Sequence, residues 1–160
     1  MMSRRIIILL VLIPITFLTS CGFKKINLNN GDSIHIQSIN ITGERRVGTI
    51  IKNDILLISN ADSNDKYNID VKIIKKKANK IKDDTGKVIR HTLSITADFK
   101  MESANNSRES IYRSITRSSD YDVAKNHADT INNENNVYKN IVQQISDDLV
   151  GIINLTIKIK

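Results

Sequence analysis

Residues Ile89–Met101 alternate between two kinds of side chain at every step. Successive side chains of a β-strand point to opposite faces, so this period of two predicts a strand with one buried and one wet face. An antiparallel sheet tolerates that arrangement when another layer covers its apolar side. One face would carry Ile89, His91, Leu93, Ile95, Ala97, Phe99 and Met101, and the other Arg90, Thr92, Ser94, Thr96, Asp98 and Lys100.

Three further segments have strand patterns. Ser33–Thr42 carries isoleucines at 34 and 36 and then, one step out of phase, at 39 and 41, which predicts a β-bulge. Tyr67–Lys75 alternates cleanly, and Ser110–Ser118 alternates with a more polar composition. Turn sequences at 83–86 and 104–108 predict that hairpins join the last three strands. The pattern leaves the partner of the first strand open.

Two segments show the helical period instead. Apolar residues recur at three- and four-residue steps within Glu44–Ser59 and, over a longer stretch, within Val123–Ile152. Asp120 or Asp122 would cap the second helix, because a carboxylate there accepts free N–H groups and favours the positive end of the helix dipole. Asn154–Lys160 would follow as a short strand or a loose tail. The predicted buried stripe of the second helix is Ala124, Ala128, Ile131, Asn135, Tyr138, Val142, Ile145, Leu149 and Ile152.

This order of elements predicts an α+β fold. A sheet of about four strands with one apolar face needs a cover, and the two helices can supply it. We therefore expect a two-layer sandwich over residues 33–160, with a long C-terminal helix.

The N-terminal segment has the three-part plan of a bacterial secretory signal. Arg4 and Arg5 precede the apolar run Ile6–Leu18, and Leu-Thr-Ser leads to Cys21. The run is shorter than the roughly 20 apolar residues that span a bilayer. The end of the run resembles a lipobox, in which the cysteine thiol is lipidated and the chain is cut before it. We expect a signal peptide at 1–20, a lipidated Cys21 and a tether over 21–32; a plain secretory signal with an incidental cysteine is the alternative.

Catalytic and metal-binding patterns are absent from the sequence. His35, His91 and His127 fall in separate predicted elements, and no His, Cys, Asp or Glu residues have zinc-type spacing. The six glycines are scattered, so no phosphate-binding loop is present. We therefore expect that the protein is not an enzyme and that it has neither a cofactor nor a metal site.

The basic residues are the remaining candidates for a site. The net charge of +7 favours anionic partners. The predicted location in the cell envelope makes nucleic acid an unfavourable candidate for the partner. An aromatic content of 4% without tryptophan argues the same way. Lysines crowd around the turn at 83–86, and folding the hairpin would bring the two sides together to clamp a phosphate; a solvated basic hairpin is the alternative. The candidates are Lys75, Lys76, Lys77 and Arg90, with Arg113 and Arg117 as a second pair.

Several motifs, in order, resemble one lipoprotein family. They are Cys21-Gly22-Phe23, the strand with isoleucines at 34, 36, 39 and 41, the block Ser118–Asp122, the pair His127-Ala128 with Ile131, and the helical run Ile141, Val142, Ile145 and Leu149. Together they are similar to the lipopolysaccharide-assembly lipoprotein family LptE in its alphaproteobacterial form. Asn132 and Asn135 depart from the alanines that are usual in the last helix of the family.

The resemblance implies a role at the outer membrane. Gly22 after the cysteine goes with export to that membrane in lipoproteins of this kind. A family member plugs and supports the β-barrel LptD, and contacts lipopolysaccharide during its assembly at the outer membrane. Lys75, Lys76, Lys77 and Arg90 would then be the lipopolysaccharide-binding residues. The alternative is a stand-alone envelope lipoprotein that binds an anionic ligand or tethers a cell-wall factor.

Overall fold

The computed structural model of the protein describes residues 33–105 and 110–158. The predicted signal peptide at 1–20, the lipidation site Cys21 and the tether over 21–32 lie outside the described residues. No helix within the described ranges combines the length and apolarity needed to cross a membrane.

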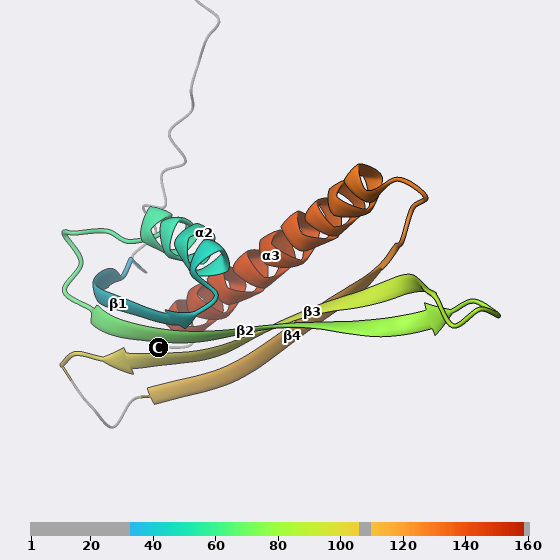
Figure 1. Ribbon diagram of the computed structural model, residues 1–160. Coiled ribbons are helices and arrows are strands. Elements are labelled where there is room, and N and C mark those ends of the chain that lie inside the picture. Colours follow the sequence, from blue (N-terminus) through green and yellow to red (C-terminus); the bar gives the residue numbers. More distant parts are fainter. Residues whose placement is uncertain (1–32, 106–109, 159–160) are drawn as a thin grey trace, which may run out of the picture. The chain divides into compact units, whose positions relative to one another are not determined.

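Four strands form one mixed sheet in the order β1-β2-β3-β4 (Figure 1). They are β1 (His35–Gly43), β2 (Lys66–Lys82), β3 (Val88–Ser103) and β4 (Ser110–Asp122). Strands β2, β3 and β4 pair antiparallel, which confirms the predicted meander. Strand β1 pairs parallel to β2, after a crossover through the helix α2 (Arg45–Leu57). The structure thus supplies the strand partner that the sequence pattern left open.

The predicted bulge lies in β1. The pairing of β1 with β2 skips a residue between Ile36 and Ser38. A slip of one residue turns the following side chains to the other face of the sheet. The bulge therefore lets isoleucines on both sides of it reach the core: Ile36 is buried, and Ile39 and Ile41 pack against the buried cluster.

Helices α2 and α3 (His127–Lys158) cover one face of the sheet (Figure 1). The core lies between the two layers and confirms the α+β sandwich. Phe99, with 1% of its surface exposed, is one of its largest members. The sheet contributes Tyr67, Ile69, Val71, Ile73, Leu93, Ile95, Ala97, Phe99, Met101 and Tyr121, and the helices contribute Val47, Ile51, Ile55, Ile141, Val142, Ile145, Leu149 and Ile153.

Gly43 makes the tight passage from β1 into α2 possible. Its φ is +96°, in the region that favours glycine, and a Cβ on it would lie 1.9 Å from the carbonyl oxygen of Ile73. At Gly48, a Cβ would come within 2.8 Å of Cγ2 of Ile41. These two glycines therefore let α2 begin directly after β1 and pack closely against the sheet.

Helix α3 begins and ends later than the predicted range Val123–Ile152. Its predicted caps, Asp120 and Asp122, belong to β4, because the ladder continues until the Val123 N–H donates to the Ile89 carbonyl at 2.9 Å. Asp120 accepts from Lys80 on β2 and Asp122 accepts from Arg90 on β3 instead. The Asn126 side chain accepts from the Ala128 N–H at the observed start of the helix.

Residues 154–158 are not the predicted strand or loose tail, because α3 continues to Lys158. Ile153 is fully buried and Ile157 packs against the core one turn later, so the helical period wins over the alternating one. The predicted stripe is also too long at its other end. Ile131 is 46% exposed, and full burial begins only at Ile141.

Replacement of Val142 by aspartate tests the contact between α3 and the sheet. Val142 is 1% exposed, so Val142→Asp buries an unpaired charge and should lower the free energy of unfolding by about 3 kcal/mol or more. Urea unfolding followed by circular dichroism measures this loss. The neighbouring exposed residue provides the control, Gln144→Asp, which should change stability by about 0.5 kcal/mol at most. Equal unfolding midpoints for the two variants would contradict the burial of this face of α3.

Candidate functional site

The face of the sheet opposite the helices, called here the open face, carries a polar surface. Side chains on neighbouring strands bond directly across it. Ser38 donates to Asn68 at 2.7 Å, and Ser114 donates to Asp98 at 2.6 Å. Such bonds order exposed side chains without burying them, so the open face is suited to contact with water or with a polar partner.

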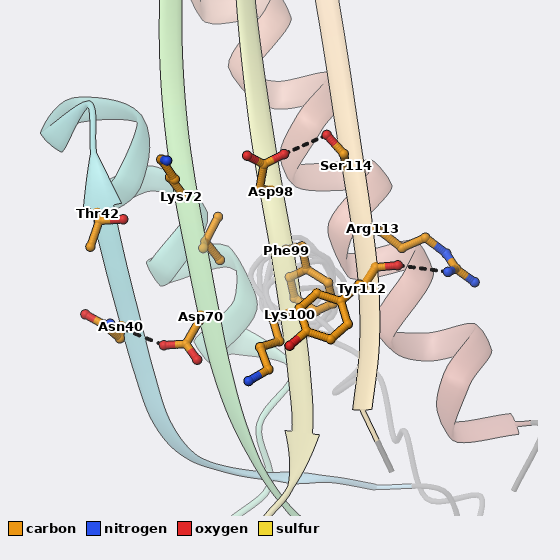
Figure 2. A pocket seen from close by; sticks show the side chains of 11 residues that line it. Asn40, Thr42, Asp70, Lys72, Asp98, Phe99, Lys100, Tyr112, Arg113 and Ser114 are labelled. Carbon is orange, nitrogen blue, oxygen red and sulfur yellow. Dashed lines mark hydrogen bonds between the residues drawn. The ribbon is translucent and has the colours of Figure 1, made fainter. Parts of the chain in front are cut away.

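A hollow of about 400 Å³ lies on the open face (Figure 2). Lys72 and Lys100 stand beside the carboxylates of Asp70 and Asp98, so cations and anions alternate around it. The Lys100 Nζ lies 5.5 Å from the ring centroid of Tyr112, and Lys100 also forms an ion pair with Glu102. This mixed lining can hydrogen-bond a ligand, and its three cationic side chains, Lys72, Lys100 and Arg113, exceed its two carboxylates by one.

The register of the β2–β3 hairpin divides the predicted lipopolysaccharide-binding residues between two faces. Lys75 and Lys77 share the covered face with Ile73 and contact α3. Lys76 points the other way, opposite Ser94, and Arg90 also lies on the open face, opposite Asp122. The hairpin therefore does not bring the four side chains into one phosphate clamp.

Lys75 and Lys77 belong to a cluster with three residues that were not among the predicted site residues: Tyr121, Glu134 and Tyr138. The Glu134 carboxylate lies 2.8 Å from the Lys77 Nζ and 3.8 Å from the Lys75 Nζ. The Tyr121 hydroxyl donates to the same carboxylate at 2.6 Å. Each ammonium also lies over a ring, Lys75 at 4.9 Å from the Tyr138 centroid and Lys77 at 5.2 Å from that of Tyr121. This Glu134 cluster fastens the hairpin to α3.

Mutual stabilisation shifts the pKa values in the Glu134 cluster. The hydrogen bond from Lys77, followed by that from Tyr121, holds the pKa of Glu134 below its usual range. The hydrogen bond to Glu134 raises the pKa of Lys77. Burial, and then the bond to Glu134, raises the pKa of Tyr121. Both ammonium groups are already partnered, so a ligand would have to compete with Glu134 for them.

The other predicted arginines also have partners within the chain. Arg90 contacts Asp122 at 2.6 Å, with Lys80 paired to Asp120 nearby. Arg117 reaches Asp148 on α3 at 2.6 Å, while Arg113 donates to the carbonyl of Tyr112 at 2.9 Å.

Lys76, unlike Lys75, Lys77 and Arg90, has no ion pair within the described residues. Beyond Ile73, β2 has no β1 beside it, and lysines are a common protection for such a free sheet edge. Protection of the free edge of β2 is therefore a physical reason for a solvated basic hairpin that binds no ligand. Binding of lipopolysaccharide by these residues stays a prediction.

The histidines offer no metal site in the described ranges, where no group of three or more potential ligands occurs. The His91 ring lies 5.4 Å from that of Tyr121, and its Nδ1 is buried without a hydrogen-bond partner among the described residues. Glu134 could have been found from the sequence, because steps of four to Tyr138 and three to Ile141 continue the buried stripe towards the sheet.

Acid should weaken the Glu134 cluster. Because the pKa of Glu134 is lowered on folding, its stabilisation is complete above the ordinary value of 4.5 and disappears as the pH falls below it. Glu134→Gln should reduce stability by about 1 kcal/mol at neutral pH and by less at about pH 3. Urea unfolding at both pH values measures this. Asp147→Asn, on the same helix and without an ion pair among the described residues, is the control, because Asp147 accepts only from Gln143 there. Equal pH dependence in all three proteins would contradict the prediction.

Comparison with known proteins gives structural neighbours only. No family model and no curated protein sequence matches the chain. Among solved structures, the chain is similar to rare lipoprotein B from Shewanella oneidensis, with a TM-score of 0.58 and 13% identity over 74% of this chain and 95% of that one. It is also similar to a minor lipoprotein from Acinetobacter baumannii, with a TM-score of 0.57 and 15% identity over 78% and 92%. The chain therefore has the fold of these two bacterial lipoproteins.

Proposed function

We propose that the protein is an outer-membrane lipoprotein of lipopolysaccharide assembly, similar to LptE, that plugs and supports an LptD-like β-barrel. The observation that carries the proposal is the fold shared with rare lipoprotein B over 95% of that chain. The lipobox-like sequence ending in Cys21 supports it independently, since it would supply a lipid anchor.

The physical character of the two faces supports the plug. The helices and the covered face bury one another, so the domain does not need a partner to complete its core. The open face remains polar, as a surface within a water-filled barrel would need to be. Two or three acyl chains on Cys21 would hold the domain at the membrane, because each buried methylene contributes about 0.8 kcal/mol.

The alternative is a stand-alone envelope lipoprotein that binds a ligand. The hollow on the open face favours it, because its mixed lining provides hydrogen-bonding groups without a barrel. The two proposals differ in what accompanies the protein in its membrane and in the effect of its loss.

Affinity purification from outer membranes distinguishes the two. The plug predicts that a barrel protein of much greater mass accompanies the full chain, and that depletion lowers the lipopolysaccharide on the cell surface. A Cys21→Ala variant, which cannot be lipidated on that thiol, should leave the membrane fraction. Recovery of the lipidated protein without a barrel, together with normal surface lipopolysaccharide, would favour the stand-alone alternative.

Single lysine substitutions test the predicted contact with lipopolysaccharide. Lys76 is exposed and has no ion pair in the described part of the chain, so Lys76→Ser should weaken binding about threefold at low salt and less at high salt. Lys75→Ser and Lys77→Ser should have smaller effects on binding, because these ammonium groups are shared with Glu134. Binding to immobilised lipopolysaccharide measures the changes.

Lys52→Ser is the control, because Lys52 is exposed on α2 and its replacement removes the same single positive charge. If Lys52→Ser and Lys76→Ser weaken binding equally, then net charge and not the hairpin attracts the ligand. If neither has an effect, Lys76 is solvated and serves only the free edge of β2.

A further inference from the structure

The outer edge of β4 has a row of backbone groups without partners in the described chain. β4 pairs only with β3 there, without a register shift. The Val123 N–H bonds to Ile89, and bonding alternates along an antiparallel pair. Odd-numbered residues of β4 therefore bond to β3, and Ser114 and Thr116 turn their N–H and C=O groups outward. The guanidinium of Arg113 confirms this direction by donating to the outward carbonyl of Tyr112.

A groove runs beside this edge, and Arg117, Asp147 and Asp148 line it together with the apolar Ile115, Ile152 and Leu155. Its volume is about 560 Å³, and it lies between residues 114–117 of β4 and the last turns of α3. Leu155 is 62% exposed there, and Ile152 lies beside it. The side chain of Ile115 belongs to the covered face, on the same side as α3. A strand added to β4 would therefore place every second side chain in the groove.

Gly151 keeps the groove open. A glycine within a helix is destabilising relative to alanine, so its presence calls for a reason. A Cβ at Gly151 would meet nothing within 4 Å. Packing among the described residues thus gives no reason for the glycine, whereas a chain seated between β4 and α3 would.

Charge indicates the kind of segment that fits. Arg113 and Arg117 flank Ile115 on the covered face. Arg117 is paired with Asp148, but Arg113 has no carboxylate partner in the described residues. A second copy of β4 would offer no acid at these positions, because its covered-face side chains run Ile111, Arg113, Ile115, Arg117, Ser119 and Tyr121.

We propose that the outer edge of β4 binds an extended segment of another polypeptide as a fifth strand. The segment places an apolar side chain opposite Ile115, against Ile152 and Leu155, and an acidic side chain opposite Arg113. Backbone hydrogen bonds to Ser114 and Thr116 provide the affinity, and the two side chains provide the specificity. The inference needs only a polypeptide strand as ligand and does not rest on the proposed role in lipopolysaccharide assembly.

A synthetic peptide tests the proposal. Thr-Ser-Thr-Val-Thr-Glu-Thr, antiparallel to β4, places serine, valine and glutamate opposite Arg117, Ile115 and Arg113. Fluorescence anisotropy with the full chain in detergent should give saturable binding. Methylation of the amide nitrogens of the two threonines beside valine should abolish it, because these N–H groups would face β4. Exchange of glutamate for glutamine should weaken binding to the wild type but not to Arg113→Gln.

Two variants of the protein block the site in different ways. Thr116→Pro removes an outward N–H that β3 does not use, and proline is tolerated on such an edge. It should weaken peptide binding about fivefold to tenfold relative to Thr116→Ala, which loses the same hydroxyl contact with Thr96. Gly151→Leu fills the groove and should weaken binding similarly without impairing the helix. The exposed Asn140→Leu, outside the groove, should bind like the wild type.

The results expected for strand addition differ from those expected without it. Binding that is lost on amide methylation and in both blocking variants, with unchanged circular dichroism, supports strand addition. No saturable binding to the wild type, or equal binding by the methylated peptide, overturns it. A dimer of the peptide-free protein that Thr116→Pro dissociates would also overturn it, because the edge would then bind a second copy of this chain.

Discussion

The packing of β3 against the C-terminal half of α3 is the constraint on which the rest of the structure depends. Leu93, Ile95 and Ala97 on the strand are fully buried, as are Ile145 and Leu149 on the helix. β3 is also the only described strand with two long antiparallel neighbours. Because this strand is fixed between its neighbours and beneath the helix, its alternation decides which side chains of the other strands are buried.

The same alternation distributes the charges. Lys75 and Lys77 fall on the covered face beyond the end of the apolar core, where α3 presents Glu134. Lys76, one residue away, falls on the open face with Arg90. A run of lysines that looks like one basic patch in the sequence is therefore two groups in the structure. Lys75 and Lys77 secure the hairpin, whereas on the open face Arg90 is paired with Asp122 and Lys76 has no ion pair in the described residues.

The two sheet edges differ in how they are protected. The distal part of β2 is exposed but rich in lysine, which discourages pairing with another strand. The edge of β4 carries hydroxyl side chains instead of a row of lysines, and the groove beside it combines Ile115, Ile152 and Leu155 with Asp147 and the Arg117–Asp148 pair. This contrast places the capacity for polypeptide recognition on β4, on the side of the sheet away from β1, while the open face and its hollow stay available for polar contacts.

Periodicity alone determined the number and kind of the elements, the bulge in β1 and most of the buried face, because side-chain direction in a strand or helix is a local property of the backbone. Tertiary structure decided the parallel pairing of β1, the extension of α3 to Lys158 and the use of Asp120 and Asp122 as strand partners. It also decided that Lys75 and Lys77 meet Glu134, whose position on α3 is more than fifty residues away in the chain. Such contacts depend on long-range register and helix placement, and a local pattern of residues does not contain either.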